Sequence, residues 1–140
     1  MKVQVIRSNR KTIGLEVRVD ESVILRAPAV DEISDVEWKS ILGEFTERVN
    51  HFCKIMEVTV GRITIRNQKT RWGSCSSKGN VNFNYQLYYM PRELMDYVII
   101  HELSHRRHMN HSAEFWQEVE KYCKTYRECR KKLRDYEIAP

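Results

Sequence analysis

The feature that most constrains this chain is an apolar stretch that runs directly into a cluster of histidines. Residues 94–100 read Leu-Met-Asp-Tyr-Val-Ile-Ile, and His101-Glu102-Leu103-Ser104-His105 follow. Pro91 suits the first turn of a helix, where its missing N–H costs no hydrogen bond. A helix that is apolar almost all round is stable when the rest of the domain surrounds it. The sequence therefore predicts a central buried helix whose C-terminal end carries the histidines.

His101 and His105 lie four residues apart, so on a helix their imidazoles project from the same face, one turn from each other. Two imidazoles in that arrangement can bind one zinc ion at about 2.0–2.1 Å. Glu102, next to the first ligand, can take a proton from water on the metal and pass it to a leaving amine. Because this five-residue pattern is an established metallopeptidase signature, we predict a site for one zinc ion per chain, with Glu102 as the catalytic base.

A catalytic zinc site of this kind needs a third protein ligand. His108 is a poor choice, because on a continuing helix it lies about 10 Å along the axis from His101. His111 can reach back if the chain turns after the helix, and Asn110 suits the left-handed residue of such a turn. We therefore predict His111 as the third ligand and interpret His108 as a partly exposed residue or a neighbour of the ligands. A carboxylate from the last helix is the alternative, with Glu118, Glu120 and Glu128 as candidates.

The N-terminal part of the chain has a strand pattern followed by a helix pattern. Apolar side chains alternate with polar or small ones from Ile13 to Val19, and an apolar run at residues 23–25 follows a polar break, which predicts a β-hairpin. Ser34 and Glu37 have the spacing of a capping box for the next helix. Its predicted apolar stripe consists of Trp38, Ile41, Leu42, Phe45, Val49, Phe52 and Met56.

The second half of the chain completes the fold. Residues 62–66 and 80–86 alternate like strands, with a long polar, basic loop between them. Ser112 can cap a last helix whose buried side carries Phe115, Trp116, Val119, Tyr122, Tyr126 and Leu133. These elements predict the α+β class, with a small, mostly antiparallel sheet packed with the central helix and two further helices. We expect one domain over residues 1–140, with a catalytic core at about 60–134.

Two interpretations of the loop at residues 67–79 stay open. It can line the site, with Trp72 as an apolar wall and Ser74 as a hydrogen-bond donor, or it can form a packed turn in which Gly73 sets the backbone geometry and Trp72 fills the core. Cys75 could ligate the zinc transiently and stop catalysis, although buried cysteines are usually inert. Candidates for the group that stabilises an oxyanion are Tyr88, Tyr89, Tyr122 and Arg71.

Composition limits the class of protein. The chain has 140 residues, of which 41% are hydrophobic and 31% charged, as expected for a globular domain. No apolar run approaches the roughly 20 residues of a membrane span, and charge interrupts the N-terminal segment within a few residues. None of the four cysteines forms a Cys-x-x-Cys pair. Cys123 and Cys129, expected on one helix, would point about 240° apart and could not be bridged. We therefore expect a cytoplasmic protein with reduced thiols and no membrane segment.

The motifs resemble those of the YgjP-like zinc metallopeptidases, relatives of the SprT-like proteases. The resemblance extends from about Arg7 to Leu133. It implies a zincin-like single domain that is a zinc-dependent metalloendopeptidase, acts on peptide or protein substrates, and uses the three ligands chosen above. The residues that carry it are Arg71-Trp72-Gly73-Ser74-Cys75, the stretch from Tyr97 to His105, Asn110-His111-Ser112 and Phe115-Trp116.

The resemblance also implies a strand along the cleft, which residues 81–86 would supply. An extended substrate could pair with that strand through backbone hydrogen bonds. The candidate substrate contacts are Asn82 and Asn84 on the strand and Trp72 and Ser74 in the loop. The histidine spacing matches metzincins as well, but position 108 is His where they have Gly, and no methionine follows the site to form their Met-turn. We therefore reject that assignment.

Other functions stay open at this point. The net charge of +5 permits acidic partners. SprT-like relatives include proteases that act on DNA-bound proteins, so an association with nucleic acid would be an extension of the peptidase function, although no DNA-reading motif is present. The alternatives are a nucleic-acid- or protein-binding module with a structural or absent metal, and a zinc hydrolase of a non-peptide amide.

Overall fold

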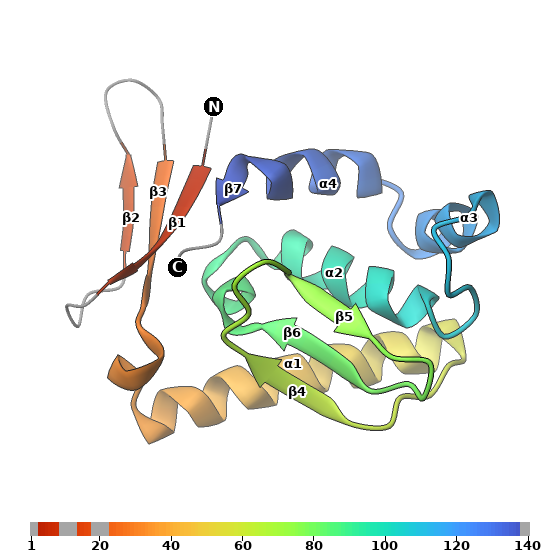
Figure 1. Cartoon of the computed structure of the whole chain (residues 1–140), viewed down its shortest axis with the longest axis horizontal. Helices are drawn as coiled ribbons and strands as arrows, with labels where there is room; N and C mark the ends of the chain where they lie inside the picture. Colours follow the sequence, from red (N-terminus) through yellow and green to blue (C-terminus); the bar gives the residue numbers. More distant parts are fainter. Residues whose placement is uncertain (1–2, 9–13, 18–22, 138–140) are drawn as a thin grey trace.

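The computed structural model describes residues 3–8, 14–17 and 23–137. In this part of the chain, helix α2 (Arg92–Ser104) lies in the middle of the main body (Figure 1). Helix α2 contacts helix α1 (Asp35–Met56), strands β5 (Gly73–Cys75) and β6 (Val81–Asn84), and helices α3 (Ala113–Tyr122) and α4 (Tyr126–Asp135). The α+β class and the central position of the histidine-bearing helix are therefore confirmed.

Helix α2 is buried along almost its whole length. It begins directly after Pro91, whose carbonyl accepts a hydrogen bond from the Leu94 N–H at 3.0 Å. The fully buried Ser104 hydroxyl donates to the Ile100 carbonyl at 2.7 Å, which satisfies a group that burial would otherwise make costly. The buried apolar side chains of this helix are Leu94, Met95, Tyr97, Val98, Ile99, Ile100 and Leu103.

Helix α1 begins where the sequence predicts, but half of the capping box is absent. The Ser34 hydroxyl accepts from the Glu37 N–H at 3.1 Å, whereas the Glu37 carboxylate accepts a hydrogen bond from the Tyr89 hydroxyl. Leu42, predicted in the apolar stripe, is 47% exposed, because it lies about 100° round the helix from the buried Ile41. Val36 and Ile55 of α1 are exposed as well. Within the described residues no helix combines the length and the apolar character needed to cross a bilayer.

Strand β4 (Ile63–Arg66) joins β5 and β6 in a three-stranded sheet with the order β4-β6-β5. Phe83 of β6 stacks on Phe45 of α1, with ring centroids 5.7 Å apart, and so ties the sheet to the helices. Strand β6 is parallel to β4 and antiparallel to β5, so this sheet is mixed and differs from the mostly antiparallel one expected. The reason is that residues 67–72 carry the chain across the sheet to β5 before it returns along the middle.

A second sheet, in the order β2-β3-β1-β7, lies beside the end of α4 (Figure 1). Strands β2 and β3 form the predicted hairpin, with Leu15 opposite Leu25. The ends of the alternating run, Ile13 and Val19, lie outside the described residues. Strand β1 pairs in parallel with both β3 and β7. The strands of this sheet are β1 (Val3–Ser8), β2 (Gly14–Val17), β3 (Val23–Pro28) and β7 (Tyr136–Glu137).

The single helix predicted after Ser112 is divided into α3 and α4 by residues 123–125. Helix α2 is about 20 Å long, whereas one straight helix over residues 113–135 would extend about 34 Å and run past its end. Because α3 and α4 both contact α2, the chain bends between them. Cys123 is the C-cap of α3 and Cys129 lies in α4, so the prediction that one helix carries both cysteines is wrong. Both sulfur atoms lie 3.9 Å from the Thr125 hydroxyl oxygen, and the cysteines are free thiols.

Gly79 and Arg106 fasten the turn between β5 and β6 to the end of α2. The Arg106 guanidinium donates to the carbonyl of Thr59 at 2.8 Å and to that of Ser77 at 3.3 Å. Gly79 has a φ of +86°, and a Cβ at this position would lie 2.7 Å from Cζ of Arg106. The positive φ therefore favours glycine, and a side chain at this position would also displace the Arg106 guanidinium.

We expect Gly79→Ala to lower the free energy of unfolding by about 1–3 kcal/mol, because it strains the turn and displaces Arg106. Gly43 in α1 is the matched control, since nothing lies within 4 Å of a Cβ there. Gly43→Ala should raise the free energy of unfolding by about 0.5–1 kcal/mol through helix propensity. Urea unfolding followed by circular dichroism measures both variants. Effects of the same sign would contradict this account of Gly79.

Candidate active site

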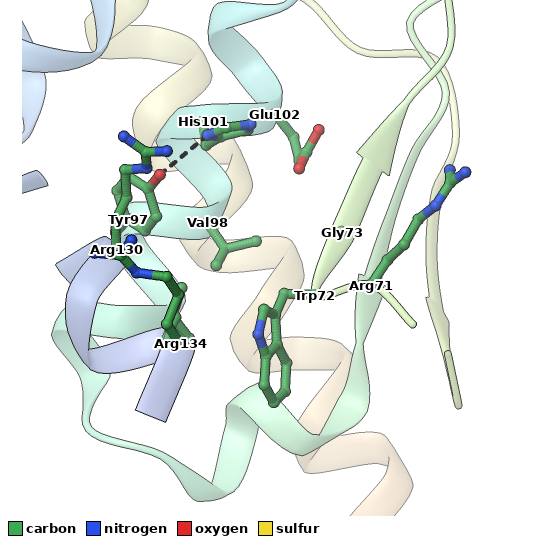
Figure 2. A pocket seen from close by; sticks show the side chains of 10 residues that line it. Arg71, Trp72, Gly73, Tyr97, Val98, His101, Glu102, Arg130 and Arg134 are labelled. Atoms are coloured by element: carbon green, nitrogen blue, oxygen red, sulfur yellow. Dashed lines mark hydrogen bonds between the residues drawn. The ribbon is translucent and has the colours of Figure 1, made fainter. Parts of the chain in front are cut away.

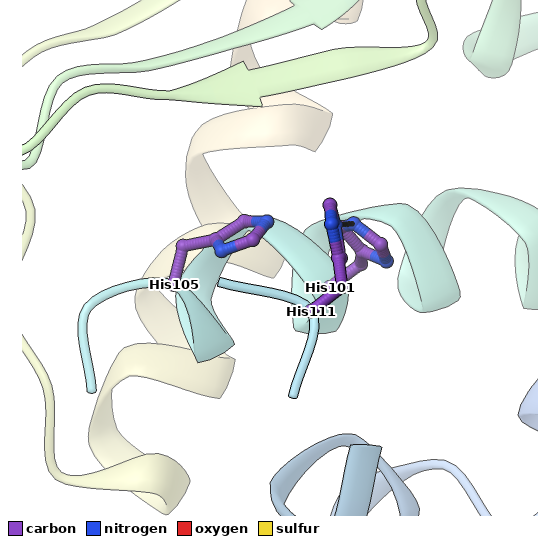
Figure 3. Close-up of side chains that lie close together, drawn as sticks. All are labelled: His101, His105 and His111. Atoms are coloured by element: carbon purple, nitrogen blue, oxygen red, sulfur yellow. Dashed lines mark hydrogen bonds between the residues drawn. The ribbon is translucent and has the colours of Figure 1, made fainter. Parts of the chain in front are cut away.

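Three histidine side chains meet at the C-terminal end of α2 (Figure 3). His101 lies in the last turn of the helix, His105 is the C-cap, and His111 comes from the segment just before α3. One nitrogen of each ring lies within 4.8 Å of the other two. Among the described residues these three form the group that could hold a metal ion, so the structure brings the predicted histidines together.

The spacing of the rings suits a single tetrahedral ion. The Nε2 atoms of His101 and His111 are 3.2 Å apart. Two imidazole nitrogens that bind one ion at about 2.0–2.1 Å and at the tetrahedral angle are separated by about 3.3–3.4 Å. Three neutral imidazoles are also a donor set that first-row divalent ions prefer. The residues present therefore fit such a metal.

Hydrogen bonds to the far ring nitrogens orient two of the imidazoles. The Nδ1 atom of His105 lies 3.0 Å from the carbonyl oxygen of His108, and a carbonyl can only accept. Nδ1 of His105 therefore carries the proton, which leaves Nε2 free for a metal. The Nδ1 atom of His101 lies 3.1 Å from the hydroxyl of Tyr97, one helical turn earlier. This contact holds the Nε2 atom of His101 toward the cluster in the same way.

The surroundings keep the imidazoles neutral, which is the form that binds metal. Burial, together with the two other histidines and Arg130, lowers the pKa of His101 to about 3. The pKa of His105 is lowered as well, mainly by burial. Because a metal competes with protons for these nitrogens, a depressed pKa favours metal binding at neutral pH.

Helix α3 packs two aromatic rings against the histidines. Ser112 caps this helix by accepting a hydrogen bond from the Phe115 N–H at 3.3 Å, so α3 begins two residues after His111. Phe115 stacks on His105 with centroids 4.5 Å apart, and Trp116 stacks on His111 at 5.9 Å. The start of α3 thus fixes both the backbone and the ring plane of His111.

The turn that returns His111 to the site differs from the one expected. Asn110 is not left-handed, since Glu57 is the only non-glycine residue of the described ranges with a positive φ. The chain instead leaves α2 through tight turns, in which the N–H groups of residues 106–108 donate to the carbonyls of residues 103 and 104. The side chain of His108 is outside the histidine group, but its carbonyl orients His105.

The carboxylates considered as a third ligand lie elsewhere. Glu118 is buried and pairs with Arg107 at 3.4 Å and with Lys121 at 3.2 Å. Glu120 and Glu128 are exposed. None of the three glutamates belongs to the histidine group.

Glu102 lies beside the histidines, buried between α2 and β5 and only 7% exposed. Burial raises the pKa of its carboxyl to about 8, and the positive charge of Arg71 opposes part of that rise. Gly73 allows β5 to come this close, because a Cβ there would lie 3.1 Å from Cγ of Glu102 and 3.1 Å from Cγ1 of Val98. Glu102 is therefore a desolvated carboxyl whose pKa suits proton transfer near neutral pH.

Strand β5, and not β6, lines the cleft. Strand β6 has β4 on one side and β5 on the other, so its backbone groups are already paired. The prediction that residues 81–86 pair with substrate is therefore wrong, and the strand itself ends at Asn84. Strand β5 borders a cavity of about 290 Å³, with Ser74 and Cys75 on one side and the three histidines and Glu102 on the other.

The four predicted substrate contacts fall into two groups. Trp72 and Ser74 line the cleft, and Trp72 also packs against the core. Asn82 lies directly opposite Ser74 in the sheet and donates to its hydroxyl at 3.2 Å. Asn84 is fully buried, and its amide donates to two backbone carbonyls of the loop at residues 67–72. Asn84 therefore holds the loop in place and does not reach the cleft.

The structure also separates the other candidates. Cys75 lines the cleft, but burial and the nearby Glu102 raise the pKa of its thiol. A protonated thiol is a poor metal ligand, so this environment agrees with the interpretation of Cys75 as an inert buried cysteine. Two of the candidates for oxyanion stabilisation can be compared directly. The Tyr89 hydroxyl donates a hydrogen bond to Glu37 at the start of α1, whereas Arg71 lines the cleft.

The model of the YgjP-like metallopeptidase domain family matches residues 7–136 of the chain. The chain belongs to this family. It is therefore a YgjP-like metallopeptidase, and membership implies a metal ion and peptide or protein substrates. No curated protein matches the sequence.

Solved structures agree with this assignment. The metallopeptidase zymogen abylysin of Pyrococcus abyssi is 26% identical, with a TM-score of 0.58 over 64% of this chain and 90% of that one. The metallopeptidase zymogen jannalysin of Methanocaldococcus jannaschii is 25% identical, with a TM-score of 0.57 over 64% of this chain and 92% of that one. Wss1 from Saccharomyces cerevisiae, at 11% identity and a TM-score of 0.53 over 94% of each chain, shares the fold alone.

Sequence reasoning missed several side chains that shape the YgjP-like site. Tyr97 reads as one more apolar residue of α2, although its four-residue spacing to His101 is a signal that the two share a face. Phe115 and Trp116 fit the predicted buried side of the last helix, which hides their contact with the histidines. No sequence pattern around Arg130 indicates that it lies at the cleft, because it reaches the cleft from α4, which only the tertiary fold places there.

We expect Tyr97→Phe to weaken the affinity of the YgjP-like domain for a divalent metal by about 10–100-fold, because His101 loses the hydrogen bond that orients its ring. Competition with a chromophoric chelator measures this affinity. Tyr88→Phe is the matched control, since the Tyr88 ring packs on Tyr89 away from the histidines. Equal affinities of the two variants would show that the Tyr97 hydroxyl does not position the ligand.

Proposed function

We propose that this protein is a zinc-dependent metalloendopeptidase with one zinc ion per chain, held by His101, His105 and His111. The observation that supports this most strongly is the convergence of three imidazole nitrogens next to the buried carboxyl of Glu102. Three histidines and one open position are a recurring catalytic zinc site. When bound, zinc supplies a Lewis acid that polarises the scissile carbonyl and lowers the pKa of an attacking water.

Glu102 is the general base in this proposal. Its carboxyl lies beside the histidines, and burial raises its pKa, which makes it a better proton acceptor than an exposed carboxylate. It can accept a proton from water and return the proton to the leaving amine. Gly73 contributes by letting the β5 backbone close over the carboxyl, which limits the access of bulk water.

The free edge of β5 is the surface on which we expect the substrate to lie. Strand β5 is at the end of its sheet and pairs with β6 on one side only. An extended peptide could therefore add to residues 73–75 as a further strand, through backbone hydrogen bonds that need little sequence preference. Cavities adjoin Glu102 both at Ser74 and at Trp72, so residues on both sides of the scissile bond have room, as an endopeptidase requires.

Arg71 is our choice for the group that stabilises the oxyanion. It lines both cavities next to Glu102 and carries a permanent charge. A guanidinium beside the scissile carbonyl would stabilise the negative charge that develops on its oxygen.

We retain the remaining predictions as part of the proposal: one domain over residues 1–140, a catalytic core at about 60–134, and a cytoplasmic location, in which free thiols persist. The alternatives are a binding module with a structural or absent metal and a zinc hydrolase of a non-peptide amide. An association with nucleic acid stays a further alternative, although Arg106 and Arg107 bind backbone carbonyls beside the histidines.

The third ligand is tested by a pair of alanine variants. The purified protein should bind one zinc ion per chain, and His111→Ala should weaken zinc binding by more than about 100-fold, since it removes a ligand and not merely a partner of one. His108→Ala, whose side chain lies outside the cluster, should bind zinc as the parent does. Chelator competition with elemental analysis measures both. The opposite result would make His108 the ligand.

The catalytic base is tested by Glu102→Gln, which keeps the shape of the side chain. We expect the variant to retain zinc and to lose about 10²–10⁴-fold in kcat, the usual contribution of general acid–base catalysis. Cleavage of a peptide library, read by mass spectrometry, measures the rate. Glu120→Gln, at an exposed position of α3, is the matched control. A Glu102→Gln protein as fast as the parent would exclude Glu102 as the base.

A further inference from the structure

A second cavity adjoins the histidine site along the same cleft. It has a volume of about 320 Å³ and lies between α2, α4 and the start of β5 (Figure 2). Arg71, Gly73, His101 and Glu102 line both this cavity and the one at the histidines. A peptide bound with its scissile carbonyl beside Glu102 would therefore place a neighbouring residue in this second cavity.

Positive charge dominates the walls of this cavity. Arg130 and Arg134 come from α4 on one side, and Arg71 comes from the segment before β5 on the other (Figure 2). In the part of the chain that the structure describes, no carboxylate forms an ion pair with any of these arginines, and Arg130 instead lies 4.4 Å from the ring centroid of Trp116. The one carboxyl among the lining residues is Glu102. Guanidinium groups that line a cavity and form no ion pair with a carboxylate favour an anionic ligand.

The remaining surface of the cavity is largely apolar. Val98 on α2, Trp72 before β5 and the buried Leu133 on α4 contribute it. A ligand that suits both parts has a short hydrocarbon stem and a planar anionic end. A carboxylate on one or two methylene groups has that form, and the planar fork of Arg matches a carboxylate through two parallel hydrogen bonds.

We propose that this cavity is a subsite for a carboxylate of the substrate, bound by Arg130 and Arg134, with Trp72 and Val98 in contact with the stem that carries it. The proposal rests on the proposed peptidase function, because the ligand is part of a peptide. Arg130 and Arg134 are one helical turn apart, so both can reach the same group. The carboxylate comes either from an Asp or Glu side chain next to the scissile bond or from the C-terminus of the substrate, where Cα and the side chain of the last residue replace the methylene stem.

Matched peptides separate these two sources. The probes are alanine-based hexapeptides in which one Glu occupies each position in turn, each with a Gln counterpart, and each made with a free and an amidated C-terminus. A side-chain subsite predicts that Glu at one position raises kcat/KM about tenfold over Gln, whether or not the C-terminus is amidated. A C-terminal subsite predicts the same gain for the free over the amidated form. Cleavage without either gain would overturn the subsite and leave the peptidase function intact.

Substitutions on α4 assign the effect to the cavity. For Arg134→Gln, the ratio of kcat/KM between the matched peptides, Glu over Gln or free over amidated C-terminus, should fall close to one. Arg127→Gln removes the same charge from the same helix, but the Arg127 guanidinium lies over the Tyr126 ring at 5.2 Å and is not among the residues that line this cavity. That variant should keep the parent ratio. The proposal would be contradicted if the double variant Arg130→Gln/Arg134→Gln kept the parent ratio. It would also be contradicted if Arg127→Gln lowered the ratio as much as Arg134→Gln does.

Binding to the Glu102→Gln protein tests the subsite without catalysis. Calorimetry with every peptide pair should find one pair whose Kd values differ about tenfold, and Arg134→Gln in the same background should abolish the difference. If the parent protein cleaves no peptide, this measurement still decides the subsite, and the missing cleavage counts against the proposed function alone. Equal Kd values within every pair would refute the carboxylate subsite.

Discussion

Burial of α2 on all sides is the constraint on which the rest of the structure depends. Helices α1, α3 and α4 and strands β5 and β6 all pack on it, so it cannot rotate without opening the core. His101 and Glu102 lie in its last turns, and His105 is its C-cap. The packing that stabilises the fold therefore also fixes three of the functional groups, on a rigid element where positions are held more closely than on a loop.

Two close approaches complete the site around that helix. Gly73 brings the β5 backbone against Glu102, which removes water from the carboxyl and raises its pKa. On the other side, the N-cap of α3 at Ser112 fixes the neighbouring His111, and the rings of Phe115 and Trp116 hold the imidazoles. The same contacts that exclude water thus set the protonation and orientation of the groups that would act on a substrate.

The elements that the sequence predicts well are those with a long apolar pattern. In α1 the pattern is a periodic stripe, and in α2 it is a nearly continuous apolar run after Pro91 that leads into the i, i+4 histidines. Strand β5 has three residues, too few for alternation to appear, although it lines the cleft. The sequence does not predict the bend between α3 and α4, because the apolar stripe continues in register across residues 123–125. The bend follows from the tertiary structure, since one straight helix would extend past the end of α2.

The site divides in the same manner. The spacing in the sequence is enough to select His101, His105 and His111 as candidate ligands, and the structure brings these three rings together without the side chain of His108. The sequence predicts a left-handed residue at Asn110, but the chain satisfies its backbone groups through tight turns at residues 105–108 instead. Arg130 and Arg134 approach the cleft from α4, which only the tertiary fold brings beside Glu102. Long-range placement of this kind depends on packing, and no local pattern encodes it.

X-ray absorption at the zinc edge tests the proposed metal site most directly. The zinc-loaded protein should show three imidazole nitrogens and one further oxygen at about 2.0–2.1 Å, in tetrahedral geometry. A sulfur ligand at about 2.3 Å, which Cys75 would have to supply, or fewer than three imidazoles would contradict the three-histidine site.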